Sequence, residues 1–284
     1  MISLRFGDLG LELNPAVGGS IASFSHRDTP ILRAARAGST NPLDQAAYPM
    51  IPFSGRIANG TFTFETTDVV LPANMPPELH AIHGQGWQSV WQVKSHSEHA
   101  ATITLNHPAS DWPWHYHARQ TFELSESRLT IEMQLQNLSA EPMPAGLGWH
   151  PFFPKNAAHL SADVELIWPS DNDTISQPPT HSPVIEQLRK GVALNALALD
   201  NAFSTHSTNA RLHWPTQART VHLQASDELG YLIVYTPTNE NFFCVEPVSH
   251  TPNCLNSTLP ASVTGARTLA SKQSMTALIT LSLV

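Results

Sequence analysis

The chain has 284 residues, of which 41% are hydrophobic and 13% are charged, and its formal net charge is -8. This composition supplies enough apolar material for a sizeable core and is unlike that of a disordered chain. The 15 Lys and Arg residues form no cluster, which argues against nucleic acid or an anionic membrane as a partner. We expect one domain over residues 1–284, because all-β sandwiches of this length are commonly single units.

In chain order, the elements follow a period of two residues rather than 3.6. The clearest example is Leu129, Ile131, Met133 and Leu135, which alternate with polar residues. Short strands are predicted at Leu9–Leu13, Thr61–Phe64, Val90–Lys94, Ala101–Leu105, Ala118–Leu124, Leu129–Leu135, Thr220–Leu223, Tyr231–Tyr235, Phe242–Val245 and Met275–Leu283. The best helical candidate, Val184–Leu199, is interrupted by Gly191, and the 23 prolines disfavour long helices. The pattern predicts an all-β sandwich or barrel with few short helices.

The N-terminus and the cysteines indicate the compartment. Residues Met1–Asp8 show neither a basic region before an apolar run nor a small-residue cleavage site. No apolar stretch approaches the ~20 residues of a membrane helix. Two cysteines, Cys244 and Cys254, are too few to stabilise a secreted domain of this size. We therefore predict a cytoplasmic protein, with a Cys244–Cys254 disulfide as the less favoured alternative.

Several common chemistries lack their sequence signatures. The chain has no phosphate-binding Gly-x-x-x-x-Gly-Lys-Ser/Thr loop, no Gly-x-Ser-x-Gly elbow and no Cys-x-x-Cys pair. His115 and His117 would share one strand face, but Glu123 does not complete a tight ligand cluster with them. Surface histidines are the favoured interpretation of that segment. We predict neither a metal nor another cofactor.

Two segments carry a candidate acid and a candidate base. His150 lies in Gly148-Trp149-His150-Pro151-Phe152-Phe153, which follows a strand end, and Glu246 ends the apolar run from Phe242. One acid and one base are the minimum for opening a hemiacetal. A hydrogen-bonded structural histidine is the alternative for His150, whereas a carboxylate at the end of an apolar strand needs a specific reason to be there.

Five motifs in order carry a resemblance to a known family. They are Tyr-Pro-Met-Ile-Pro-Phe-Ser-Gly-Arg-Ile-Ala-Asn-Gly at 48–60, His-Gly-Gln-Gly-Trp at 83–87, Pro-Met-Pro-Ala-Gly-Leu-Gly-Trp-His-Pro at 142–151, Leu-Asp-Asn-Ala-Phe at 199–203 and Val-Glu-Pro at 245–247. Together they make the chain resemble the aldose 1-epimerases, the galactose mutarotase-like family, nearly end to end. The resemblance implies a β-supersandwich of mostly antiparallel strands, an isomerase without a cofactor, a monosaccharide substrate and a monomer or homodimer.

The resemblance also implies a role for each matched residue. Glu246 matches the general base that takes the proton of the anomeric hydroxyl, and His150 matches the general acid that protonates the ring oxygen. Further matched residues hold sugar hydroxyls, and they are Arg56, His83 and Asp200. Aromatic residues that stack on a pyranose or else belong to the core are Trp87, Trp149 and Phe153.

The same motifs leave the sugar open. The galactose-specific branch has Asn-Arg, Asn-His-Thr-Tyr-Phe-Asn and Glu-Thr-Gln where this chain has Gly55-Arg56, Trp149-His150-Pro151-Phe152-Phe153 and Glu246-Pro247-Val248. Galactose or glucose is the default substrate, and a hexose 6-phosphate is the alternative within the class. Outside it, a non-catalytic sugar sensor could dispense with Glu246 or His150. A glycoside hydrolase would need a carboxylate pair such as Asp200 and Glu246.

Overall fold

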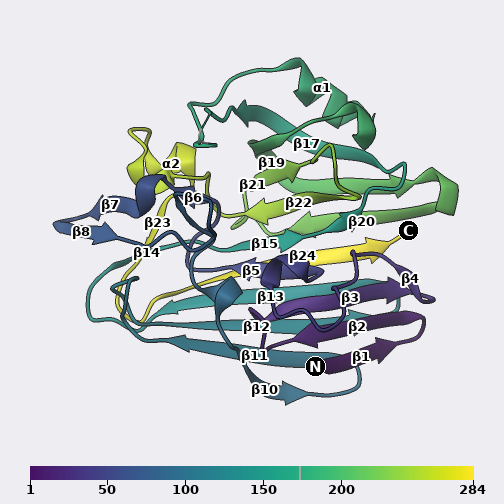
Figure 1. Ribbon diagram of the computed structural model, residues 1–284, viewed down its shortest axis with the longest axis horizontal. Helices are drawn as coiled ribbons and strands as arrows, with labels where there is room; N and C mark the ends of the chain where they lie inside the picture. Colours follow the sequence, from purple (N-terminus) through teal and green to yellow (C-terminus); the bar gives the residue numbers. More distant parts are fainter. Residues whose placement is uncertain (173) are drawn as a thin grey trace.

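The computed structural model describes residues 1–172 and 174–284, and most of these residues form antiparallel β-structure (Figure 1). The strands are β1 (Ile2–Phe6), β2 (Leu9–Asn14), β3 (Ser20–His26), β4 (Thr29–Pro30), β5 (Ala47–Met50), β6 (Arg56–Ile57), β7 (Thr61–Phe64), β8 (Thr67–Val70), β9 (Ala81–Ile82), β10 (Gln92–His96), β11 (Ala100–His107), β12 (Tyr116–Ser125), β13 (Arg128–Asn137), β14 (Met143–Ala145), β15 (Gly148–Pro151), β16 (Phe153–Pro154), β17 (His159–Trp168), β18 (Val192–Ala193), β19 (Asp200–Trp214), β20 (Arg219–Ala225), β21 (Tyr231–Tyr235), β22 (Phe242–Val248), β23 (Arg267–Leu269) and β24 (Ser274–Leu283). The helices are α1 (Pro183–Lys190) and α2 (Ala261–Thr264), with 3-10 turns at Pro42–Asp44, Ala58–Gly60, Gly86–Gln88, Leu194–Ala196, Pro215–Gln217 and Cys254–Asn256.

One sheet of 18 strands runs through the molecule. Neighbouring strands follow the order β10, β11, β12, β13, β24, β20, β19, β21, β22, β15, β5, β3, β2 and β1. The two ends of this order approach each other, because the backbone N–H of Arg5 in β1 donates to the carbonyl of Glu98 between β10 and β11, at 2.7 Å. The sheet therefore curls on itself and encloses the core, which confirms the predicted all-β supersandwich.

The period-two pattern explains how each strand faces this core. Along β13, Leu129, Ile131, Met133 and Leu135 are buried, and the polar residues between them are partly exposed. Successive side chains on a strand point to opposite faces, so one face enters the core and the other meets solvent. In Figure 1, β1 to β3 and β10 to β13 occupy the lower half of the view, and β17, β19, β21 and β22 the upper half.

The predicted helix is confirmed in its first half only. α1 begins at the N-cap Ser182, whose side chain accepts from the Val184 N–H, and it ends at Gly191, whose φ of 91° leaves the helical region. Beyond Gly191 the chain forms β18 and a 3-10 turn, so the prediction of helix up to Leu199 was wrong. The long strands β17 and β19 were not predicted, although apolar residues alternate with polar ones along 159–166 and 209–214.

One prediction about the histidine segment needs correction. His150 does not follow a strand end but lies inside β15, opposite Tyr48 of β5. The prolines of this region, Pro49 and Pro151, sit in a strand pair of only four residues, where few ladder hydrogen bonds are needed. The organisation of residues 1–284 as one domain stays a prediction.

Candidate active site

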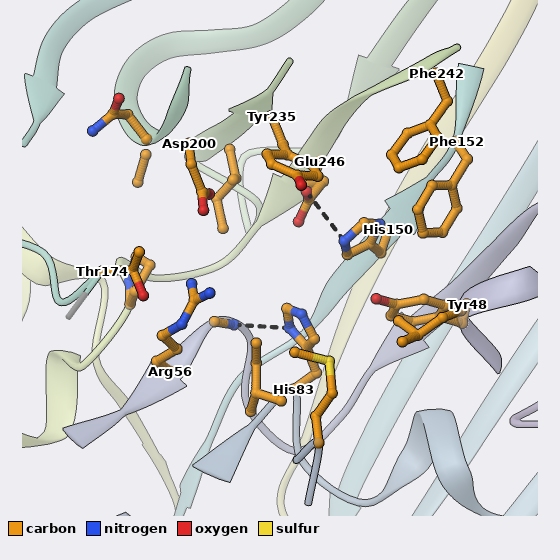
Figure 2. Close-up of a pocket in the computed structure, with 18 of the residues that line it drawn as sticks. Tyr48, Arg56, His83, His150, Phe152, Thr174, Asp200, Tyr235, Phe242 and Glu246 are labelled. Atoms are coloured by element: carbon orange, nitrogen blue, oxygen red, sulfur yellow. Dashed lines mark hydrogen bonds and ion pairs between the residues drawn. The ribbon is translucent and has the colours of Figure 1, made fainter. Parts of the chain in front are cut away.

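Five neighbouring strands form the floor of a cavity of about 420 Å³. In sheet order, β19 supplies Asp200, β21 supplies Tyr235, β22 supplies Glu246, β15 supplies His150 and β5 supplies Tyr48. Loops outside the sheet complete the wall. Cavities of this size with a few converging polar groups are typical of small-molecule sites. Figure 2 shows these side chains turned toward one space.

The candidate acid and base meet at the bottom of this cavity. His150 Nε2 lies 3.4 Å from Glu246 Oε1 (Figure 2). His150 is 8% exposed and Glu246 is 2% exposed, so both groups are largely withdrawn from solvent. The sheet register explains this meeting, because Gly148 of β15 lies opposite Val248 of β22. His150 and Glu246 are each two residues from that pair and therefore on the same face.

Burial changes the protonation of both groups. It raises the pKa of Glu246 well above its usual value, and the charge of Asp200 acts in the same direction while that of Arg56 opposes it. Burial also lowers the pKa of His150 to about 3. Both shifts disfavour the charged form, as desolvation must. The pair therefore holds one proton and no net charge over a wide pH range.

Aromatic rings fix the orientation of the imidazole. The His150 ring lies 4.6 Å from the Tyr48 ring and 4.7 Å from the Phe152 ring, at interplanar angles of 33° and 27°. Arg33 places its guanidinium carbon 4.0 Å from the centroid of Phe152, on the wall of the same cavity. These contacts hinder rotation of the imidazole about its Cβ–Cγ bond.

His83 is held as a hydrogen-bond donor to the cavity. The backbone N–H of Gly55 donates to His83 Nδ1 at 3.1 Å, so a neutral His83 must carry its proton on Nε2. Burial lowers the pKa of His83 well below its usual value, and the His150 and Arg56 charges add to this effect. The residue has a left-handed backbone with φ of 61°. The next residue must be glycine, because a Cβ on Gly84 would lie 2.2 Å from the Ile51 carbonyl oxygen.

Arg56 and Asp200 lie on the opposite wall from Tyr48 (Figure 2). Arg56 Nε donates to Glu78 Oε2 at 2.9 Å, and both side chains are mostly buried. Burial would raise the pKa of Glu78, but its hydrogen bond and ion pair with Arg56 outweigh this and lower it. Burial raises the pKa of Asp200, partly offset by Arg56. Glu78 thus anchors the guanidinium, and nothing in its sequence context indicated this.

The predicted tryptophans are core residues and do not line the cavity. Trp149 neighbours His150 on β15 and consequently points to the opposite face, into the main core. Trp87 is 1% exposed, and its indole N–H donates to the carbonyls of Ile82 and Gly84. It supports the turn that carries His83. Phe153 is also in the core, stacked on Phe243.

Other aromatic residues line the cavity instead, and the sequence reasoning missed them. They are Tyr48, Phe152, Tyr235 and Phe242. Strand parity could have found Phe242, because it shares the face of Cys244 and Glu246 on β22. Tyr48 faces His150 across the strand pair, which needed knowledge of the sheet order.

Among residues 1–172 and 174–284, one group of three side chains has the arrangement of metal ligands. It consists of His150, Cys244 and Glu246, all buried, with ligand atoms within 4.8 Å of one another. His115 and His117 belong to no such group in this part of the chain. Cys244 and Cys254 are both free, so the less favoured disulfide does not form.

Comparison with known proteins identifies the family. The aldose 1-epimerase family model matches residues 12–282. The chain belongs to the aldose 1-epimerase family. Uncharacterized protein YphB of Escherichia coli (strain K12) is 27% identical over 265 residues, covering 88% of each chain. Uncharacterized protein YihR of the same organism is 29% identical over 231 residues, covering 76% of this chain and 73% of that protein.

Solved structures agree with the fold of this family. A galactose mutarotase-like protein from Clostridium acetobutylicum superposes with a TM-score of 0.90 at 21% identity, over 99% of this chain and 94% of that one. The GalM/aldose epimerase homologue from C. elegans gives 0.85 at 15% identity, over 100% of this chain and 98% of the other. In the described residues, no helix has the length and apolarity needed to cross a membrane.

Proposed function

We propose that this member of the aldose 1-epimerase family interconverts the α and β anomers of a neutral free hexose. The observation that carries the proposal is the buried contact of 3.4 Å between His150 Nε2 and Glu246 Oε1 at the floor of a sugar-sized cavity. Family membership supports an isomerase acting on carbohydrates, and the cavity supplies the acid, the base and the hydroxyl-binding groups.

In the proposed reaction Glu246 accepts the proton of the anomeric hydroxyl while protonated His150 donates to the ring oxygen. The electron pair of the O1–H bond forms the C1 carbonyl, and the bond from C1 to the ring oxygen breaks with its electrons on that oxygen. Rotation about the bond between C1 and C2 turns the other face of the aldehyde toward the C5 hydroxyl. Reclosure reverses both proton transfers, so the protein ends unchanged.

The electrostatics of the site favour the two proton transfers of ring opening. A raised pKa makes Glu246 a stronger base, and a lowered pKa makes His150 a stronger acid. The step starts after the proton held by the pair moves from Glu246 to His150, and ring opening then converts this ion pair back into a carboxylic acid and a neutral imidazole, the arrangement that burial stabilises. His83, with its proton on Nε2, supplies a neutral donor to the sugar oxygens beside His150.

The charges around the cavity support a neutral sugar over a hexose 6-phosphate. Three arginines line the cavity, and one nitrogen of each is already engaged: Arg33 Nη2 donates to the Leu43 and Gln45 carbonyls, Arg36 Nη2 lies 3.5 Å from Asp44 Oδ1, and Arg56 Nε pairs with Glu78. A phosphate clamp needs guanidinium donors that are free to bind it. Four carboxylates on the wall, Asp44, Asp200, Glu240 and Glu246, also oppose an anionic ligand.

The test is polarimetry on freshly dissolved α-glucose and α-galactose, with glucose 6-phosphate and aryl glycosides as comparison substrates. We expect faster mutarotation of a free hexose, little effect on the phosphate and no release of reducing sugar from glycosides. Tight binding of a hexose without acceleration would indicate a sugar sensor instead. Hydrolysis of a glycoside would assign Asp200 and Glu246 to a glycosidase.

A further inference from the structure

A thiol that the proposed reaction does not use lies against the acid and base. Cys244 is fully buried and precedes Glu246 by two residues on β22, so both side chains point to the same face. Its sulfur, a ring nitrogen of His150 and a carboxylate oxygen of Glu246 all lie within 4.8 Å of one another. This combination is unusual for a site that needs only proton transfer.

The three ligand types suit one class of ion. Thiolate, imidazole and carboxylate together are typical ligands of Zn²⁺ and its softer analogue Cd²⁺. In a tetrahedral zinc site the ligand atoms are about 3.3–3.8 Å apart, as bond lengths near 2.0–2.3 Å imply. His150 Nε2 and Glu246 Oε1 are 3.4 Å apart and the other pairs of ligand atoms are within 4.8 Å, so small side-chain movements are needed to close the shell. His150 and Glu246 line the cavity, so water or a sugar oxygen can approach the ion from that side.

The charges balance when the ion binds. Coordination displaces two protons to solvent, the thiol proton of Cys244 and the proton held by the His150 and Glu246 pair, and a dication with one thiolate and one carboxylate has no net charge. A neutral cluster avoids the cost of a buried uncompensated charge. Arg33 lies on the cavity wall, and its positive charge stays close to the neutral cluster.

We propose that His150, Cys244 and Glu246 form an inhibitory site for Zn²⁺ or a similar soft divalent cation. The bound ion takes the ring nitrogen of the acid and the carboxylate of the base, so a metal-loaded chain neither binds sugar at this floor nor opens its ring. The inhibitory consequence rests on the proposed function, whereas metal binding itself does not. Cys244 acts only in metal binding.

The binding test uses Cd²⁺, because its thiolate complexes absorb in the ultraviolet by charge transfer from sulfur. Wild type is titrated beside Cys244→Ser and the matched control Cys254→Ser, which removes the other buried cysteine. We expect one equivalent of Cd²⁺ to produce the band in wild type and in Cys254→Ser, and Cys244→Ser to lose it. No band in wild type, or an unchanged band in Cys244→Ser, would overturn the proposal.

Three further measurements distinguish loss of the metal site from misfolding and from failure of the proposed function. Circular dichroism checks that Cys244→Ser is folded; Glu246→Gln, which keeps both thiols, must also weaken Cd²⁺ binding. In the polarimetric assay Zn²⁺ should inhibit wild type, chelation should restore it, and Cys244→Ser should keep its rate without inhibition. Mutarotation that Zn²⁺ leaves unchanged contradicts the inhibitory site, whereas a metal-free wild type without mutarotation contradicts the proposed function alone.

Discussion

The hydrogen bond from Gly55 N–H to His83 Nδ1 allows the contribution of His83 to stability to be tested separately from its contribution to activity. His83→Asn keeps a side-chain oxygen near the Nδ1 position and tolerates the left-handed backbone, because asparagine is enriched in that conformation. It removes only the Nε2 donor that faces the cavity. His83→Leu fills a similar volume but removes both the acceptor and the donor.

The structure sets the magnitudes. In His83→Leu the buried Gly55 N–H loses its acceptor, which costs about 1–3 kcal/mol of unfolding free energy, and poor tolerance of the left-handed backbone adds to this. His83→Asn should stay within about 1 kcal/mol of wild type, since one hydrogen bond of this kind contributes about that much. Both variants should lose about 1.5–3 kcal/mol of transition-state stabilisation, or roughly 10- to 100-fold in kcat/KM.

The assays are urea unfolding followed by circular dichroism and anomer exchange followed by polarimetry. We expect Asn to separate the two effects, with near-normal stability and reduced kcat/KM. Wild-type kcat/KM in His83→Asn would refute the donor role of His83. Equal destabilisation of His83→Asn and His83→Leu would refute the role of the Gly55 hydrogen bond.

Three further predictions follow from the same site. Because burial lowers the pKa of His150 to about 3, kcat/KM should show no limb on either side near the ordinary histidine pKa of 6.5, and a limb there contradicts the burial argument. The folded-state pKa of Glu246 is raised above its unfolded value of 4.5, so its contribution to stability is complete below pH 4.5 and is lost as pH rises through the folded pKa. The unfolding free energy of Glu246→Gln should therefore increase relative to that of wild type as pH rises, in total by about 1.4 kcal/mol for each unit of pKa shift. A difference between the two proteins that does not change with pH would exclude this linkage. Glu78→Gln removes the charged anchor of Arg56 and should raise KM roughly tenfold while changing kcat less; an unchanged KM would show that Arg56 needs no anchor.

Ten of the 24 strands in the described residues were predicted, because their apolar residues alternate, as in Leu129 to Leu135, where one face meets the core. The prediction missed β17 and β19, although apolar and polar residues alternate along 159–166 and 209–214 and the apolar ones are the buried ones. The shortest strands, such as β6 and β9 with two residues each, were not predictable, because two residues show no alternation.

For the site, motif order indicated Glu246, His150, His83, Arg56 and Asp200, and the structure brings all five to one cavity. Their roles in the reaction stay a prediction. The assignment of Trp149 as a stacking residue required its side-chain direction, which one position on a strand reverses.

Glu78 could not be found from the sequence, because its partner Arg56 lies on a different segment and the intervening chain folds back to bring them together. The preferred sugar depends on which hydroxyls the cavity wall contacts. Those contacts come from loops whose positions the motifs do not specify. The cytoplasmic location and the oligomeric state also stay predictions.

The most direct test of the acid and base pair is the exchange rate between α and β anomers at equilibrium, measured by NMR magnetisation transfer on glucose and galactose. Wild type should accelerate exchange of at least one of them. Glu246→Gln and His150→Ala should each reduce the acceleration by about 10²–10⁴-fold while remaining folded. Full acceleration in folded Glu246→Gln would contradict the account, because the buried carboxylate is its proposed base.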